Sequence, residues 1–180
     1  MSQENVGAMI ATDIYKPAEW HDFFVVTGGG AAALAGLVFV AMSINLDVVA
    51  QNATHRLRAI NMLTGFTAAF MICALALMGG QGHQAVGAEW FVVATVAGLS
   101  YVHHYLQAFR MGGNKADLRP NRLAGGTTCY VAQIVGAVVL MLGHVAGLYI
   151  AAVGLIILFA YMISGAWLLL VAVHEDRSRR

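Results

Sequence analysis

This chain of 180 residues is 59% hydrophobic and only 11% charged, with a mean hydropathy of +0.71. Soluble domains usually carry about 25% charged residues, so the composition indicates an integral membrane protein in contact with the lipid bilayer. The formal charge of +1 leaves no basic surface of the kind that nucleic acid requires, and we therefore exclude DNA and RNA as partners.

Long apolar stretches separate the charged residues, and a helix needs about 20 apolar residues to cross the hydrocarbon core. Three stretches each hold one span. A fourth stretch, between Arg122 and Glu175, contains no charged residue and is about twice as long as one span requires, so we expect it to turn back at residues 143–147. The predicted spans are 23–46, 59–80, 90–110, 123–142 and 147–173. The sequence thus predicts an all-α membrane protein, a bundle of five transmembrane helices.

Basic residues fall almost entirely on one side of these five spans, and Lys and Arg in short loops accumulate on the cytoplasmic side. The opposite side receives only Lys16. We therefore predict that the N-terminus lies outside and the C-terminus in the cytoplasm. Residues 1–22 form an exterior tail and the start of an interfacial helix, 23–173 the transmembrane domain and 174–180 a basic cytoplasmic tail. The basic residues on the predicted cytoplasmic side are Arg56, Arg58, Arg110, Lys115, Arg119, Arg122, Arg177, Arg179 and Arg180.

Small residues recur every four positions in the first span, at Gly28, Ala32 and Gly36. A helix face of small residues lets a second backbone approach closely, which is how helices associate in lipid. We favour packing within the chain, with a dedicated subunit interface as the alternative. Similar rows lie in the second and fourth spans: Gly65, Ala69 and Cys73, and Thr128, Ala132 and Gly136.

The segment EWHDFFVVTGGGAAALAGLVFVAMSINL and the closing GAWLLLV resemble small multi-span membrane proteins of the actinobacterial type. The resemblance covers the first quarter of the chain and the last span. It implies a location in the bacterial plasma (inner) membrane, and it carries over no activity and no catalytic residue.

The third span contains two adjacent histidines, His103 and His104, roughly 10 Å above its inner end. A polar side chain without a partner in hydrocarbon costs several kcal/mol. We therefore predict that at least one of the two points into protein and hydrogen-bonds a polar residue of another span. The partners expected by depth are Asn45, Asn61 and Gln133.

Ser100 and Gln107 share helix faces with the histidine pair, so an inner polar cluster is expected. Such a cluster is either a hydrogen-bonded structural feature, which we favour, or a wet pathway that opens to the cytoplasm. The two cysteines, Cys73 and Cys129, differ in predicted depth by about 12 Å. A disulfide tolerates at most roughly 7 Å between Cα atoms, so we predict that both stay reduced and apart.

No cofactor is predicted, although haem or a transition metal is a minority possibility. A haem on the histidine pair would need a second ligand, because no other span offers a histidine at this depth. His21, His83 and His144 lie one in each exterior segment and are weak candidates for a metal site, with solvated loop histidines favoured.

The predicted spans contain no H-E-x-x-H motif and no pair of carboxylates. We therefore interpret the chain as a non-enzymatic plasma-membrane protein that self-associates or serves another membrane protein as an accessory or scaffolding subunit. The first alternative is an oligomeric channel or small-solute pore lined by the inner polar cluster. The second alternative is a haem- or metal-binding membrane subunit.

Overall fold

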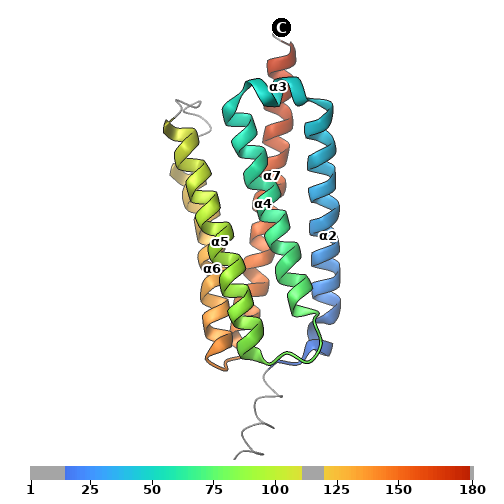
Figure 1. The fold of residues 1–180 in the computed structure, drawn as a ribbon, viewed down its shortest axis with the longest axis vertical. Helices are drawn as coiled ribbons and strands as arrows, with labels where there is room; N and C mark the ends of the chain where they lie inside the picture. Colours follow the sequence, from blue (N-terminus) through green and yellow to red (C-terminus); the bar gives the residue numbers. More distant parts are fainter. Residues whose placement is uncertain (1–14, 111–119, 179–180) are drawn as a thin grey trace, which may run out of the picture.

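Five long helices and one short helix make up the computed structural model, which describes residues 15–110 and 120–178 (Figure 1). Each long helix contains a stretch long and apolar enough to cross a membrane, so the prediction of a five-helix, multi-pass membrane protein is confirmed. The helices are α2 (Pro17–Ile44), α3 (Leu46–Gln51), α4 (Ala53–Ala76), α5 (His83–Arg110), α6 (Pro120–Met141) and α7 (Ala146–Ser178).

Helices α4, α5, α6 and α7 pack in sequence around a common axis, and α7 returns to contact α4. Helix α2 lies outside this group and packs chiefly on α4. The long helices alternate in direction, so α3 and the C-terminal end of α7 share one end of the molecule, here called the α3 end (Figure 1). The start of α2 and the turns before α5 and α7 share the opposite end. The ribbons of α5 and α6 diverge from those of α4 and α7 toward the α3 end (Figure 1).

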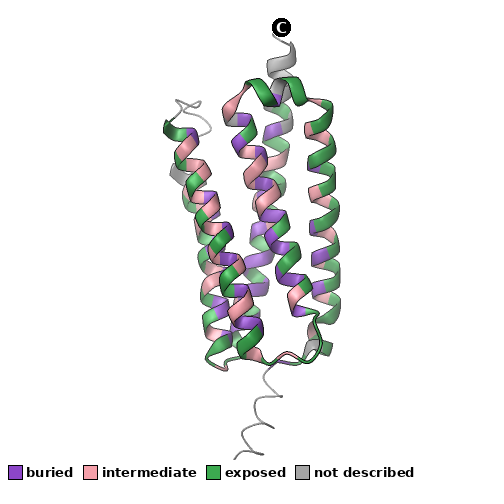
Figure 2. Ribbon diagram, viewed as in Figure 1, coloured by how far each residue is buried: buried purple, intermediate pink, exposed green. Residues whose placement is uncertain are grey.

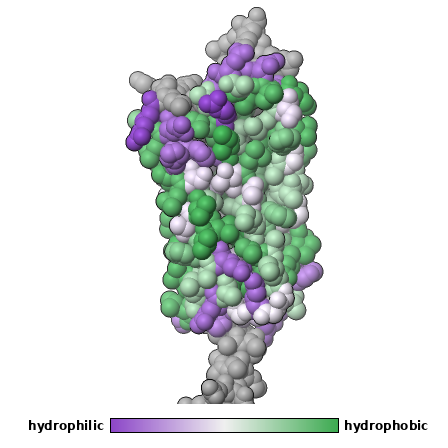
Figure 3. All heavy atoms as spheres, in the orientation of Figure 1, coloured by the Kyte–Doolittle hydropathy of each residue, from purple (hydrophilic) through white to green (hydrophobic). Residues whose placement is uncertain are grey.

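Polar residues gather toward the two ends of the molecule and apolar residues between them, as a bilayer requires (Figure 3). Arg56, Arg58 and Arg110 lie on segments at the α3 end, and Lys16 precedes α2 at the other end. Residues 1–14, 111–119 and 179–180 lie outside the described part of the chain. Lys115 belongs to the second of these ranges, so its predicted side is not tested by the structure. The predicted tail from residue 174 is the continuation of α7 as far as Ser178.

The third span begins seven residues before the predicted boundary, at His83 instead of residue 90. That boundary followed Glu89, one of the charged residues that separate the apolar stretches. The Nε2 atom of Gln81 donates to both carboxylate oxygens of Glu89, at 2.9 and 3.1 Å, so the charge is accommodated inside the helix. The predicted turn at residues 143–147 is present, and Gly143 adopts a φ of +84° there, a conformation that glycine supplies without strain.

Two clusters of buried side chains form the core, one above the other along the axis, and buried positions face inward on every helix (Figure 2). The cluster far from the α3 end contains Phe24, Trp90 and Leu140, and Trp90 donates its indole N–H to the carbonyl of Ile72 at 3.0 Å. The cluster nearer the α3 end contains aromatic and sulfur-bearing side chains: Phe66, Tyr101, Tyr130, Met62, Met162 and Cys129.

Glycines bring the helix backbones together at the end far from α3. A Cβ atom added at Gly136 of α6 would lie 2.9 Å from the carbonyl oxygen of Gly147 in α7. In α2, a Cβ atom added at Gly28 would lie 3.0 Å from Cβ of Cys73, so Gly28 packs within the chain as we favoured. Ala32 and Gly36, in contrast, are exposed.

The predicted face of α2 was therefore wrong beyond Gly28. A step of four residues advances about 40° around a helix beyond a full turn, so Gly36 lies about 80° away from Gly28. The residues of α2 that face the chain are Phe24, Gly28, Ala31 and Val38, at spacings of three, four and seven.

Cys73 and Cys129 are both buried and both free, as predicted. Each belongs to a different core cluster, which reflects their different depths in the bundle.

Candidate functional site

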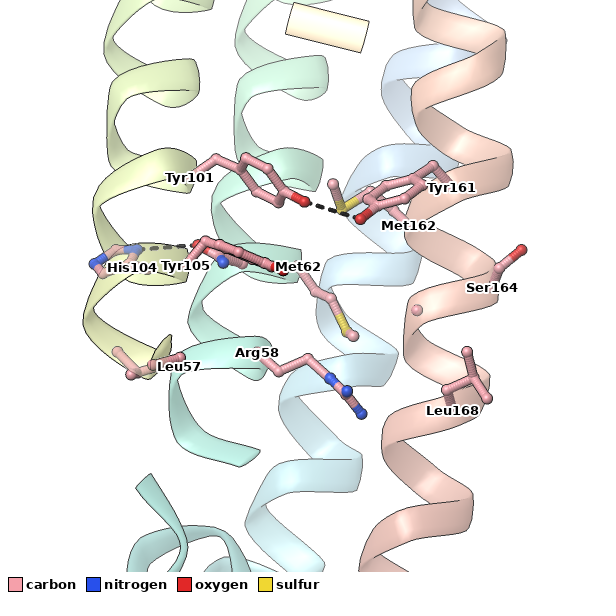
Figure 4. A pocket seen from close by; sticks show the side chains of 13 residues that line it. Leu57, Arg58, Met62, Tyr101, His104, Tyr105, Tyr161, Met162, Ser164 and Leu168 are labelled. Carbon is pink, nitrogen blue, oxygen red and sulfur yellow. Dashed lines mark hydrogen bonds between the residues drawn. The ribbon is translucent and has the colours of Figure 1, made fainter. Parts of the chain in front are cut away.

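A cavity of about 160 Å³ opens between α4, α5 and α7 near the α3 end (Figure 4). We call it the inner cavity. Most of its wall is apolar, and its polar groups come from residues on all three helices. The described residues that line it are Leu57, Arg58, Asn61, Met62, Tyr101, His104, Tyr105, Ala108, Tyr161, Met162, Ser164, Gly165 and Leu168.

Of the two adjacent histidines, His104 lines the inner cavity. Nδ1 of His104 lies 3.0 Å from Oδ1 of Asn61, which joins α5 to α4 (Figure 4). This is the hydrogen bond to another span that we predicted, made with one of the three expected partners. Because a carbonyl oxygen only accepts, this arrangement places the proton on Nδ1 and leaves Nε2 as an acceptor. His103 is exposed, and its ring contacts that of His104 at a centroid distance of 5.7 Å.

Two tyrosine hydroxyls form the second polar pair of the cavity. The hydroxyl oxygens of Tyr101 and Tyr161 lie 2.9 Å apart and join α5 to α7 (Figure 4). The Tyr130 ring of α6 packs against Tyr101 at a centroid distance of 5.7 Å. These rings fit because α6 presents Gly126 to Tyr101, where any Cβ atom would overlap the phenol, and Gly125 to Tyr161. The tyrosine cluster therefore depends on the paired glycines of α6.

Sequence reasoning missed this tyrosine cluster. Its signals were Tyr101 and Tyr105 one helical turn apart on α5, and the Gly125–Gly126 pair that leaves room beside them. Tyrosines in a span are more often placed at the membrane interface, and the sequence does not give the rotation of α6 and α7 that turns these rings inward.

The other predicted members of the inner polar cluster do not join His104. Gln133 is buried deeper, between α6 and α7, where its Nε2 donates to the carbonyl of Ala151 at 2.9 Å. Asn45 donates to a carbonyl of its own helix and lines an apolar groove between α2 and α7. Ser100 lines a separate groove between α4 and α5, and Gln107 is half-buried on α5. The predicted single cluster was therefore wrong, because an expected depth along the sequence does not give these residues a common direction.

Packed side chains close the bundle beyond the tyrosine pair. Trp90, Phe24 and Leu155 are each at most 1% exposed in the cluster far from the α3 end. Leu140 and Leu148 complete this packing with exposures of 0% and 1%. The described side chains beyond the tyrosine pair are therefore tightly packed.

Metal ligands do not assemble in the described part of the chain. No group of three or more His, Cys, Asp or Glu side chains is close enough there to hold a metal ion, so His21, His83 and His144 do not come together. Nδ1 of His21 instead lies 3.2 Å from a carboxylate oxygen of the adjacent Asp22.

Comparison of the chain with models of known protein families, with curated proteins and with solved structures found no match. The resemblance of the first and last spans to actinobacterial membrane proteins therefore stays a prediction. The inner cavity and the outward faces of the helices are the features of this protein that bear on its function.

Proposed function

We propose that this protein is a non-enzymatic membrane protein that self-associates, as an accessory or scaffolding subunit in the bacterial plasma membrane. The observation that carries the proposal is a row of small residues on the outward face of α2, formed by Gly29, Ala32 and Gly36 and here called the outer α2 face. Cβ atoms added at Gly29 or Gly36 would meet nothing within 4 Å, and Ala32 is exposed. Close approach of backbones over such a face is a main source of attraction between helices in lipid.

A second copy of the chain suits the outer α2 face. Helix α2 is the span least covered by its own chain, with 22% of its most apolar window buried, against 33 to 50% for the others. The helix carries no charged residue after Asp22, so two copies can approach without electrostatic repulsion. A twofold axis would place this face against itself, small residues against small residues, which is how identical subunits most often pair.

Energy transfer between fluorescently labelled copies in liposomes tests self-association as the ratio of protein to lipid is varied. Gly36→Ile adds bulk where the chain itself leaves open space, so the fold is preserved while close approach is blocked. We expect association to weaken about tenfold, the effect of losing roughly 1.4 kcal/mol of contact. Ala160→Ile is the matched control, because Ala160 is exposed on a different helix, α7. Equal association of both variants and the wild type, or a wild type that stays monomeric throughout, would contradict the proposal.

We further propose that the α3 end faces the cytoplasm, which places the N-terminus outside. The support is the distribution of basic residues, with Arg56, Arg58 and Arg110 at the α3 end and Lys16 at the other. A membrane-impermeant maleimide should label a Lys16→Cys variant in intact cells and an Arg56→Cys variant only after permeabilisation. The reverse pattern would overturn this orientation.

A channel ranks second because the side chains of the bundle farther from the α3 end are tightly packed. Conduction would need a path between copies of the chain instead of through one copy. A haem or metal subunit ranks third, since His104 is engaged with Asn61 and His103 faces outward.

A further inference from the structure

An apolar groove runs along the side of the bundle between α2 and α7, and we call it the α2–α7 groove. Helix α2 packs chiefly on α4, so space remains between α2 and α7. The groove has a volume of about 250 Å³. The described residues that line it are Leu34, Leu37, Val38, Ala41, Met42, Asn45, Val49, Met62, Phe66, Ile163, Ala166, Trp167 and Leu169.

The groove has a buried floor and an exposed rim. Phe66 and Met62 of α4 lie at the floor with exposures of 1% and 4%. Leu37 of α2 and Trp167 of α7, on the rim, are 65% and 68% exposed. All four residues belong to apolar spans, so the rim faces hydrocarbon chains when the protein is in a bilayer. A chain that enters from the rim would contact three helices.

The length of the groove matches one leaflet of a bilayer. Its lining on α2 extends from Leu34 to Asn45, which is about 16 Å at about 1.5 Å per residue. The hydrocarbon core is about 30 Å thick, so each leaflet accounts for about 15 Å. Asn45 lies at the end nearest α3, and the lining on α2 from Leu34 to Met42 is apolar. A phospholipid has the same order, with its ester groups near the interface and its hydrocarbon toward the middle of the bilayer.

Water and a second helix fit the groove less well than a single chain. A buried water makes about three hydrogen bonds. Among the described lining residues, polar side-chain atoms come from Asn45 and from the indole of Trp167, on different helices. A helix with its side chains is about 10–12 Å across, too wide for this volume over a length of about 16 Å. An engineered apolar cavity of about 150 Å³ in another protein binds benzene, so about 250 Å³ suits roughly ten carbon atoms.

We propose that the α2–α7 groove binds one acyl chain of a phospholipid from the leaflet at the α3 end. The ester groups lie near Asn45, and the chain passes over Met62 and Phe66. Bulk lipid is as apolar as the groove, so the hydrophobic effect does not favour this site, and the preference comes from van der Waals contact with three helices.

The site is separate from the outer α2 face. Ala32 of that face and Ala41 of the groove are nine residues apart, which at about 100° per residue places them on opposite sides of α2. A second copy on the outer α2 face therefore leaves the groove open to lipid. The inference stands whether or not copies of the chain associate.

Photolabelling of the full-length protein in vesicles of phosphatidylethanolamine and phosphatidylglycerol tests this site. A small fraction of the phosphatidylglycerol carries a diazirine in the middle of one acyl chain, and mass spectrometry locates the label. Exposed Leu99 of α5 reports ordinary contact with surrounding lipid. We expect label on the buried floor residues Met62 and Phe66 as well as on Leu99. Moving the diazirine toward the end of the chain should shift the floor label from Met62 to Phe66, because α4 begins at the α3 end.

Two phenylalanine variants separate the groove from the rest of the lipid-facing surface. Ala41→Phe fills the groove from α2 and should lower the floor label at least about tenfold without changing the Leu99 label. Ala160→Phe is the matched control, because Ala160 is exposed and does not line the groove, and it should change the floor label less than about twofold. If Ala41→Phe fails to fold, Ala166→Leu fills the groove from α7 and should have the same effect.

Three results would overturn the proposal. The first is label on Leu99 but not on Met62 and Phe66 in the wild type, which is also the result expected if a second copy or another part of this chain fills the groove. The second is an equal loss of floor label in the groove variant and in Ala160→Phe. The third is a shift of the label from Phe66 to Met62 as the diazirine moves toward the end of the chain.

Discussion

The contact between α6 and α7 allows a quantitative test of how this bundle is held together. Gly147 is buried at the start of α7 and faces the backbone of α6. A Cβ atom at this position would lie 2.5 Å from the carbonyl oxygen of Gly136 and 2.9 Å from Cα of Leu140. Ordinary carbon-to-oxygen contacts are about 3.3 Å or longer, so Gly147→Ala requires the two helices to separate by about 0.8 Å. Backbone atoms cannot rotate out of the way as side chains can.

We expect Gly147→Ala to lower the free energy of unfolding by about 1–3 kcal/mol, the usual cost of overpacking a close contact. The matched control is Gly30→Ala on α2, where the added Cβ atom would make an ordinary contact 3.6 Å from Cε1 of Phe159. Replacing a helical glycine at such a position should be neutral or should stabilise the protein by roughly 0.5–1 kcal/mol. The two substitutions thus add the same methyl group with opposite expected signs.

Titration of the purified protein from dodecyl maltoside into sodium dodecyl sulfate, followed by far-ultraviolet circular dichroism, measures both changes under one condition. If Gly147→Ala unfolds at the same detergent fraction as the wild type, the close approach of α6 and α7 described above is incorrect. Loss of stability in Gly30→Ala of similar size would show that the method reports a general effect of glycine replacement.

A double-mutant cycle of His104→Leu and Asn61→Leu should give a coupling energy of about 0.6 kcal/mol and at most about 1.7, as for other hydrogen bonds between membrane helices; additive effects would contradict the bond. Burial raises the pKa of Tyr15 to about 12, so its contribution to stability is complete below pH 10 and is lost as pH rises toward 12. Stability of a Tyr15→Phe variant should therefore fall less than that of the wild type over this range, and parallel curves would argue against a buried Tyr15. Cys73 and Cys129 should resist a thiol reagent until the protein unfolds, and rapid labelling of the folded protein would contradict their burial.

The number of spans could be predicted because the hydropathy and the length of each apolar stretch are read directly from the sequence. The long uncharged stretch before Glu175 indicated two helices joined by a turn, and Gly143 marks that turn. The hydrogen bond between His104 and Asn61 could be predicted because depth follows from the rise per residue, and a polar group in hydrocarbon needs a partner.

The rotation of each helix about its axis could not be predicted with the same success. Asn45 and Gln133 were expected at the depth of His104, yet each points into a different space. The drift of the Gly28, Ala32 and Gly36 row has the same origin, since a four-residue repeat does not follow one face of a straight helix. Which residues line a cavity depends on these rotations, and they are set by contacts among all the helices together.

Glycines have different neighbours in the two halves of the bundle. Far from the α3 end, Gly136 and Gly147 bring two backbones into contact, and Trp90 fills the space beside them. Near the α3 end, Gly126 of α6 accommodates the Tyr101 ring of α5 instead of a neighbouring backbone, and Tyr101 also lines the inner cavity between α4, α5 and α7. The effect of a substitution at a glycine of this protein therefore depends on whether a backbone or a ring occupies the space beside it. We therefore expect Gly126→Ala to displace Tyr101 and alter the inner cavity, while changes at Gly136 should act on stability without altering the cavity lining.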